Sequence, residues 1–281
     1  MIEVILLLAV AFAWLIFAVI SDYRTTEIPN WLNFSLIIFA LGIRFFHSLF
    51  SGNFNFLLHG VIGFGIFFAI GNLMYYGKIF GGGDMRLMIA LGTIIPLSND
   101  LLSNIKISVS FLFLFLIFGS VYGIFASTYF AFKNARKFRK EFVIQFRENL
   151  RFSIMIMLFG IITLILGITF DRFFLYFGIL IFILPVLYVF LKSIDNATMR
   201  KKISPEFLRE GDWLYEDVRV GKRLVRANWE GLTKSEIMLL KKRNKPVMIK
   251  QGIAFGIVFL ASFLTLVYFY FFNLPLWNSF W

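Results

Sequence analysis

Long apolar stretches are the feature that most constrains how this chain can fold. A membrane-spanning helix needs about 20 mostly apolar residues. Eight stretches come close to that length: 2–20, 31–50, 56–77, 86–103, 107–132, 152–170, 173–191 and 251–272. The sixth and seventh are short and separated only by Asp171-Arg172, so they could be two spans in a tight hairpin or a re-entrant pair. We therefore expect an α-helical polytopic membrane protein with six to eight transmembrane helices.

Composition agrees with this fold class and excludes several kinds of catalytic site. The chain is 59% hydrophobic and contains 39 phenylalanines, more apolar surface than a soluble core of 281 residues needs. It has no cysteine, which excludes disulfides, a cysteine zinc site and a thiol nucleophile. The only histidines, His47 and His59, lie near one predicted outer loop and are interpreted as interfacial residues without a catalytic role. We expect no metal and no cofactor.

The first apolar stretch resembles a signal peptide only in its length. It carries Glu3 where a signal peptide has basic residues, and it is followed by Asp22 and Arg24 rather than by a small-residue cleavage site. We expect it to remain as the first transmembrane helix.

The distribution of positive charge predicts the orientation. With the N-terminus outside, 25 of the 28 lysines and arginines fall in inner segments, and only Arg44, Lys106 and Arg172 fall outside. This asymmetry matches the positive-inside rule and predicts a multi-pass protein of the cell membrane. Most of the net charge of +12 then faces the inner leaflet, which favours anionic lipid as a neighbour and argues against nucleic acid.

The apolar stretches and charged segments together divide the chain into five parts. Residues 192–250 are the one polar segment, and we expect a small cytoplasmic α+β domain there. The complete division is a transmembrane core at 1–132, a basic amphipathic cytoplasmic loop at 133–151, a transmembrane hairpin at 152–191, the α+β domain at 192–250, and a C-terminal transmembrane helix with its tail at 251–281.

Short local patterns give the expected elements of the α+β domain. Residues 213–215, 223–225 and 246–249 are typical of short strands bounded by turns. Thr233 followed three residues later by Glu236 is a capping box, which predicts a helix that runs to about Arg243.

Two aspartates mark the candidate functional site. Asp22 ends the first apolar stretch, and Asp84 follows Gly81-Gly82-Gly83 just before the fourth. A carboxylate in or near a bilayer is costly, and the charge map places both at the inner membrane face. The glycines give backbone freedom and allow another segment to approach Asp84 closely. Pro29 suits the first turn of the second helix, so we expect 23–28 to be a short connector that keeps Asp22 near the membrane surface.

A pair of nearby carboxylates suits aspartyl proteolysis. Two such groups share one proton and titrate as a unit. One carboxylate can then take a proton from water while the other polarises the scissile carbonyl, with no metal or side-chain nucleophile. An ion- or proton-coupled transporter is the alternative, although transporters place such acids near the midplane of repeated halves. A non-catalytic scaffold would leave the aspartates unexplained.

The residues resemble a known family at this point. Asp22 followed by Ile28-Pro29-Asn30, and Gly81-x-Gly83-Asp84 before the fourth stretch, resemble the GxGD-type aspartyl prepilin and preflagellin peptidases, or class III signal peptidases. The resemblance covers roughly residues 1–130. The segments 208–212, 231–233 and 249–253 also resemble the C-terminal domain of archaeal members, and the cysteine-rich region of bacterial members is missing.

This resemblance implies both a reaction and a substrate. It implies that Asp22 and Asp84 are catalytic and that Gly81, Gly83 and Pro29 support them. It also implies that the central position of the Gly81-x-Gly83 pattern, here Gly82, is variable. The implied substrates are precursors of archaellins or pilin-like proteins, cut at the cytoplasmic membrane face. Two departures are Arg86, where bacterial relatives usually carry lysine, and the long 152–191 hairpin. No role for Arg86 is carried over, because a guanidinium does not replace an ammonium directly.

Overall fold

The computed structural model describes residues 2–221, 223–228, 230–243, 245–250 and 252–272. The chain forms two compact units, one made of residues 1–123 with 253–281 and the other of residues 124–252. The last helix therefore belongs to the same unit as the first four. The predicted C-terminal tail, 273–281, lies outside the described residues.

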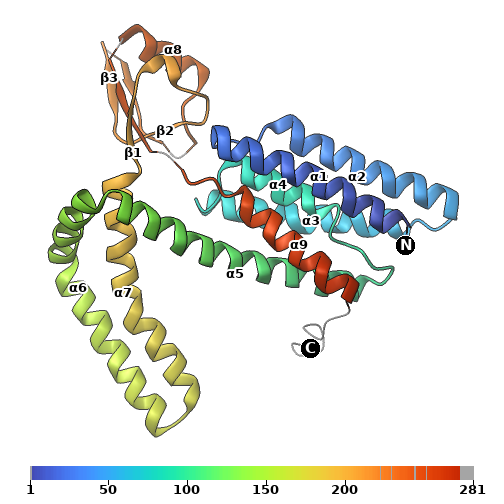
Figure 1. The fold of residues 1–281 in the computed structure, drawn as a ribbon, viewed down its shortest axis with the longest axis horizontal. Helices are drawn as coiled ribbons and strands as arrows, with labels where there is room; N and C mark the ends of the chain where they lie inside the picture. Colours follow the sequence, from blue (N-terminus) through green and yellow to red (C-terminus); the bar gives the residue numbers. More distant parts are fainter. Residues whose placement is uncertain (1, 222, 229, 244, 251, 273–281) are drawn as a thin grey trace. The chain divides into compact units, whose positions relative to one another are not determined.

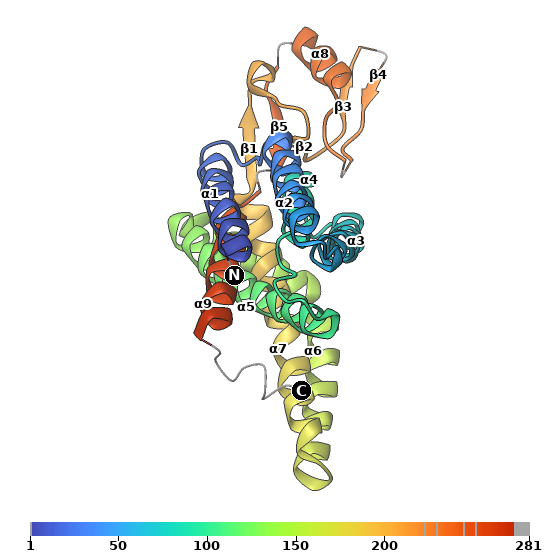
Figure 2. The same cartoon turned by 90° about the vertical axis from the view of Figure 1, so that its right-hand side faces the viewer.

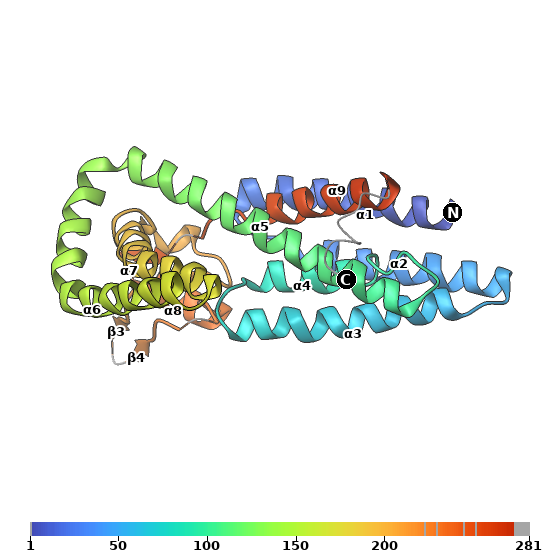
Figure 3. The same cartoon turned by 90° about the horizontal axis from the view of Figure 1, so that it is seen from below.

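The first unit is a bundle of apolar helices (Figure 1). Helix α1 packs against α2 and α9, and α3 packs against α2 and α4, so segments from both ends of the chain meet in one core (Figure 3). The helices are α1 (Ile2–Thr25), α2 (Asn30–Ser51), α3 (Asn55–Tyr76), α4 (Gly82–Gly92), the first part of α5 (Leu101–Lys133), and α9 (Gly256–Phe272).

The fourth apolar stretch departs from its prediction. A span over 86–103 is wrong, because α4 ends at Gly92 and residues 93–100 are not helical. Pro96 explains the break: it has no backbone N–H and disfavours helix at the preceding Ile95. Residues 93–97 are nevertheless buried. Irregular backbone is tolerated at membrane depth only where protein satisfies its polar groups.

Arg44 supplies the partners for this irregular segment. The charge map counted Arg44 among the outer residues, and in the structure it is fully buried within α2. Its Nε donates to the carbonyl of Thr93 at 2.8 Å, and its Nη2 donates to the carbonyls of Ile94 at 3.1 Å and Pro96 at 2.5 Å. Its Nη1 donates to the carbonyl of Phe56 at 2.7 Å. The guanidinium therefore replaces the hydrogen bonds that a continuous helix would have made.

The second unit contains the last part of α5, from Ile124, followed by a helical hairpin (Figure 2). Helix α6 (Ala135–Thr169) and α7 (Arg172–Thr198) pack along each other. Small residues allow this approach: a Cβ on Gly160 would lie 2.8 Å from the backbone nitrogen of Phe182. The expected amphipathic segment 133–151 is helical from Ala135 onward, but it continues into the next apolar stretch as a single helix.

The polar segment folds as a small α+β domain, as predicted. A three-stranded antiparallel sheet has the order β1-β5-β2, and β3 and β4 form a separate two-stranded hairpin. Two of these strands, β1 and β3, had no expected counterpart. The elements are β1 (Arg200–Ile203), the 3₁₀ helix η1 (Pro205–Phe207), β2 (Trp213–Leu214), β3 (Val218–Val220), β4 (Arg223–Val225), α8 (Lys234–Arg243) and β5 (Val247–Lys250).

The capping box at the start of α8 is confirmed. The Thr233 N–H donates to Glu236 Oε2 at 2.9 Å, and the Glu236 N–H donates to Thr233 Oγ1 at 3.4 Å. Helix α8 then buries Ile237 and Leu240 against the apolar residues of the strands. This reciprocal cap satisfies backbone donors that the helix leaves open.

The predicted fold class is confirmed. Within the described residues, six helices are long and apolar enough to cross a membrane: α1, α2, α3, α5, α6 and α7. Helix α9 is apolar but shorter, at 17 residues. The chain is therefore an α-helical polytopic membrane protein with a small α+β domain.

Candidate active site

Asp22 lies in the last turn of α1, which continues to Thr25. The chain turns at Thr26, which has a φ of 54°. The hydroxyls of Ser21 and Thr25 both donate to the carbonyl of Glu27, at 3.0 and 3.2 Å. These bonds hold the connector close against the end of α1, so Asp22 stays beside the turn.

The connector is shorter than the sequence suggested. It comprises residues 26–29, where 23–28 was expected, because α1 extends beyond Asp22. Pro29 is not in the first turn of α2 but directly before it, as the N-cap residue, with φ −61° and ψ 139°. Its fixed φ suits this position too, and the extended ψ directs the chain from the connector into the helix.

Asp84 lies in the first turn of α4. Gly81 is the N-cap residue, and Gly82, Gly83 and Asp84 open the helix. None of these three glycines has a positive φ, so the expected need for backbone freedom is wrong. What Gly83 provides is space: an added Cβ would lie 3.2 Å from both the Cβ and the backbone nitrogen of Ile28.

The two sequence motifs are in direct contact. Gly83 packs against Ile28 of the connector. The side-chain amide of Asn33 donates to the Gly83 carbonyl at 3.4 Å. Arg86 Nη1 donates to Asn30 Oδ1 at 2.9 Å and to the carbonyl of Gly82 at 3.1 Å. Arg86 therefore links the segment that follows Asp22 to the turn that carries Asp84.

Asp22 also contacts a segment that sequence reasoning did not include. It is buried, with 5% of its surface exposed, and its Oδ2 accepts a hydrogen bond of 2.6 Å from the backbone N–H of Gly256. Gly256 is the first residue of α9. A Cβ at this glycine would lie 3.1 Å from the same carboxylate oxygen. The sequence around Gly256 is uniformly apolar, so no polar signal pointed to it.

The two acids lie on α1 and α4. Asp22 is buried and Asp84 partly exposed, and the two carboxyls are close enough to interact electrostatically. An arrangement with one enclosed and one accessible carboxyl can hold a shared proton and present it to a bound molecule. Among the described residues, no group of three or more histidines, aspartates and glutamates could hold a metal ion.

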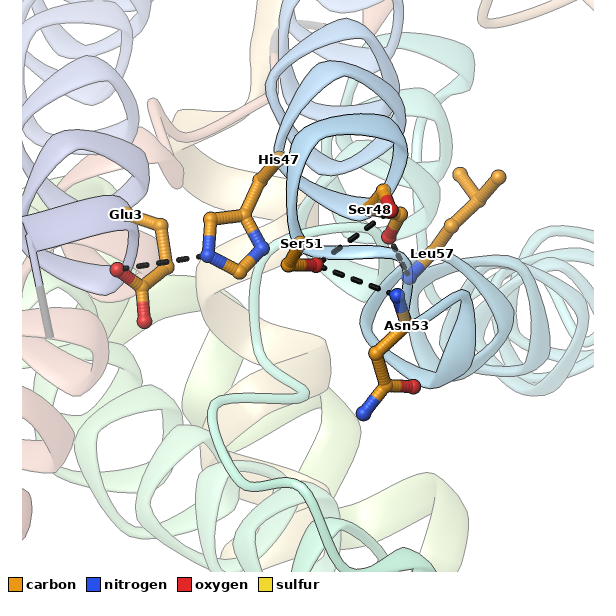
Figure 4. Close-up of polar contacts among 6 residues, drawn as sticks. All are labelled: Glu3, His47, Ser48, Ser51, Asn53 and Leu57. Atoms are coloured by element: carbon orange, nitrogen blue, oxygen red, sulfur yellow. Dashed lines mark hydrogen bonds and ion pairs between the residues drawn. The ribbon is translucent and has the colours of Figure 1, made fainter.

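The polar residues at the other end of α1 and α2 make a different kind of contact (Figure 4). His47 Nε2 lies 3.8 Å from Glu3 Oε2. Ser48 Oγ accepts from the Leu57 N–H at 3.2 Å and so ties the end of α2 to the start of α3. Glu3 and Asp22 lie near opposite ends of α1. His47 is therefore separate from the aspartate pair.

Fold and site together define a polytopic helical membrane protein in which two helices each bring one aspartate to a shared position. The sequence of residues 9–127 matches the model of the type IV leader peptidase family. This range contains both aspartates and every contact between their motifs. It includes neither α9 nor the α+β domain. The resemblance inferred from the motifs is confirmed over this part of the chain.

Preflagellin peptidases of three methanogens are similar to the chain. The protein of Methanococcus maripaludis is 29% identical over 144 residues, which is 47% of this chain and 62% of that protein. The protein of Methanococcus voltae is 32% identical over 31% of this chain and 37% of its own length. That of Methanocaldococcus jannaschii is 32% identical over 30% and 36%. The match thus spans less than two thirds of each relative, and no solved structure matches the chain.

Proposed function

We propose that this protein is a membrane-embedded aspartyl endopeptidase that removes the short leader of archaellin or pilin-like precursors at the cytoplasmic membrane face. The observation that carries the proposal is the contact between the Asp22 and Asp84 motifs inside the segment that matches the leader peptidase family. The names of the three similar proteins support the same reaction and favour a preflagellin-type substrate.

Asp22 and Asp84 are the proposed catalytic residues, and they act as one unit. One carboxylate takes a proton from a water molecule, whose oxygen attacks the scissile carbonyl carbon, while the protonated partner gives its proton to the carbonyl oxygen. Collapse of the tetrahedral intermediate then breaks the C–N bond: the leaving amine takes the proton that came from water, and a hydroxyl of the intermediate returns its proton to the other carboxylate. Gly81, Gly83 and Pro29 support this site by fixing the two turns that carry the acids.

The proposed orientation follows from charge. The aspartate face and the 192–250 domain are cytoplasmic, and the N-terminus is outside, because this arrangement puts most lysines and arginines on the inner side. The basic start of α6 then lies next to anionic inner-leaflet lipid. A leader peptide on the cytoplasmic side meets the aspartates without crossing the bilayer.

A single introduced cysteine tests the orientation, because the natural chain has none. Ser204 is exposed in the α+β domain and is the residue to replace. In intact cells, Ser204→Cys should resist a membrane-impermeant thiol reagent and react only after the membrane is opened. Labelling in intact cells would place the 192–250 domain outside and overturn the orientation.

Cleavage in a purified system tests the reaction. Detergent-solubilised protein is incubated with a preflagellin-type precursor, and loss of the leader is followed by gel shift and by mass spectrometry of the new N-terminus. The natural chain should cleave, and Asp22→Asn and Asp84→Asn should each lose about 10³-fold or more of the rate, as expected when either half of an acid–base pair is removed.

Acids away from the pair provide the matched controls. Asp100→Asn and Asp171→Asn alter exposed carboxyls and should leave cleavage unchanged. Turnover by either Asp22→Asn or Asp84→Asn near the natural rate would contradict the pairing. A transporter or a scaffold would leave the precursor intact with every variant.

A further inference from the structure

A chain of contacts leads from α5 through the start of α9 to Asp22. The hydroxyl of Tyr122, on α5, donates to the carbonyl of Ala254 at 2.7 Å. Two residues later, the Gly256 N–H donates to Asp22 Oδ2. All of these residues belong to the first unit. Ala254 and Gly256 lie outside residues 9–127, the segment that matches the family.

The space around this connection is closely filled. Besides its contact with Asp22 Oδ2, a Cβ on Gly256 would lie 3.4 Å from the Cα of Val19 on α1. Gly119, one turn before Tyr122, gives room to Phe255, because a Cβ there would lie 3.1 Å from the end of that ring. Any change in the path of 254–256 therefore moves either the hydrogen-bond donor or the carboxylate.

An aromatic cluster connects the same segment to the other aspartate's turn. Phe115 on α5 packs against Phe255, Phe259 and Phe80, with ring centroids 5.7, 4.7 and 5.6 Å apart. Phe80, which directly precedes Gly81, is buried and also contacts Phe259 at 6.1 Å. The start of α9 and the turn before Asp84 thus pack against the same side chain, Phe115.

We propose that Tyr122 and Gly256 are positioning residues of the aspartate pair, with Tyr122 fixing the start of α9 so that the Gly256 N–H orients the Asp22 carboxylate. The inference rests on the proposed peptidase function and extends it to a part of the chain outside the family match. An N–H held in a fixed position directs the Asp22 carboxylate oxygen that accepts from it and so limits rotation of the carboxylate. Small displacements of such a group reduce the rate strongly.

Tyr122→Phe removes the hydroxyl and keeps the ring. Loss of one hydrogen bond at a distance from the reacting atoms should lower kcat about three- to tenfold and leave KM unchanged. It should also displace the acid limb of the profile of kcat against pH, which general loosening of the fold would not do. Tyr129→Phe, which alters an exposed tyrosine on the same helix, is the control.

Gly256→Ala tests the second link. The added methyl group meets Asp22, so kcat should fall by more than tenfold, again without a matching change in KM. Gly252→Ala is the matched control, because a Cβ at Gly252 meets no atom within 4 Å. Equal kcat values for Gly256→Ala and Gly252→Ala, or a Tyr122→Phe variant with natural kcat and pH profile, would overturn the inference.

Hydrogen–deuterium exchange of the segment 253–258 separates this inference from the proposed function, because it needs no substrate. Exchange should accelerate in Tyr122→Phe and stay unchanged in Tyr129→Phe. If the natural chain cleaves no precursor, the proposed function fails, while the exchange result still shows whether Tyr122 fixes the start of α9. Unchanged exchange in Tyr122→Phe overturns the positioning role in either case.

Discussion

Arg44 and Asp22 are both buried in the first unit, and they differ in the hydrogen-bond and charge partners that surround them. Arg44 donates to four backbone carbonyls and lies 4.4 Å from the centre of the Phe56 ring. Asp22, by contrast, accepts from backbone N–H groups at the start of α9, with the bond from Gly256 at 2.6 Å, and interacts with a second acid, Asp84. Arg44 lies 14 residues into α2, about 20 Å along that helix, so the two places are independent.

The difference separates structural from reactive burial. A buried charge whose partners are all supplied holds its surroundings in place, and removing it exposes those partners. A buried carboxylate beside a second acid is poorly stabilised in its charged form, which is common where a group must exchange protons. Burial alone therefore does not identify a site; the set of partners does.

The largest effect expected from this comparison is the loss of Arg44. Arg44→Met removes the Arg44 donor from the buried carbonyls of Thr93, Ile94 and Pro96, and each buried group left unpaired costs about 1–3 kcal/mol. The sum is comparable to the whole stability of a typical domain, so we expect little folded protein. Size-exclusion chromatography in detergent measures this. Arg172→Met, which alters an exposed arginine at the start of α7, should behave like the natural chain.

The aspartates should show the opposite behaviour. Asp84→Asn keeps the shape of the side chain and replaces one of two neighbouring ionisable carboxyls by a neutral amide, so the melting temperature should be equal to or higher than that of the natural chain, while cleavage is lost. Thermal unfolding in detergent, followed by intrinsic fluorescence, gives the comparison. A loss of stability as large as that of Arg44→Met would show that Asp84 is structural.

The glycines beside Asp84 should give an intermediate effect. Gly83→Ala pushes a methyl group against the backbone of Ile28 and separates the two motifs, so cleavage should fall by about tenfold or more. Gly82→Ala meets the guanidinium of Arg86, with Nη1 nearest at 3.2 Å, which is the end of a flexible side chain and can move. Its cleavage rate should stay within about threefold of the natural one. Equal losses in both variants would mean that the whole turn is constrained rather than the approach at Gly83.

Much of this site could be expected from sequence because its signals are local. Asp22 and Asp84 are isolated acids next to apolar stretches, and the Ile28-Pro29-Asn30 and glycine motifs lie beside them. The capping box of α8 is likewise a pattern of neighbouring residues. Such features depend on short-range chemistry, so the sequence carries them directly.

What the sequence did not indicate depends on long-range packing. Arg44 is chemically an ordinary outer-loop arginine until Thr93, Ile94 and Pro96 fold onto it, although Pro96 inside an apolar stretch was a usable sign of a helix break. The contact between Gly256 and Asp22 joins residues 234 positions apart and uses only a backbone N–H. Backbone donors have no sequence signature, so only the fold reveals this partner.

The smallest expected effect concerns Asp212, a partly buried acid in the α+β domain. Burial raises the pKa of this carboxyl above its ordinary value, although its Oδ2 accepts a hydrogen bond of 2.8 Å from the Arg209 N–H. Between the unfolded-state pKa of about 3.9 and the higher folded-state pKa, the folded protein binds more protons than the unfolded chain. Stability therefore falls as pH rises through this interval, and the loss persists at neutral pH.

Asp212→Asn tests this sign, because an amide keeps the oxygen acceptor and cannot ionise. The difference in urea midpoint between Asp212→Asn and the natural chain should increase in favour of the variant from pH 4 to pH 7. Asp217→Asn is the control within the same domain, since Asp217 Oδ1 accepts from the Ala227 N–H at 2.7 Å in an exposed setting. A difference that shrinks with rising pH would mean that the hydrogen bond from Arg209 outweighs burial. Asp212 would then resemble Arg44, whose charge is stabilised by its hydrogen-bond partners, rather than the aspartate pair.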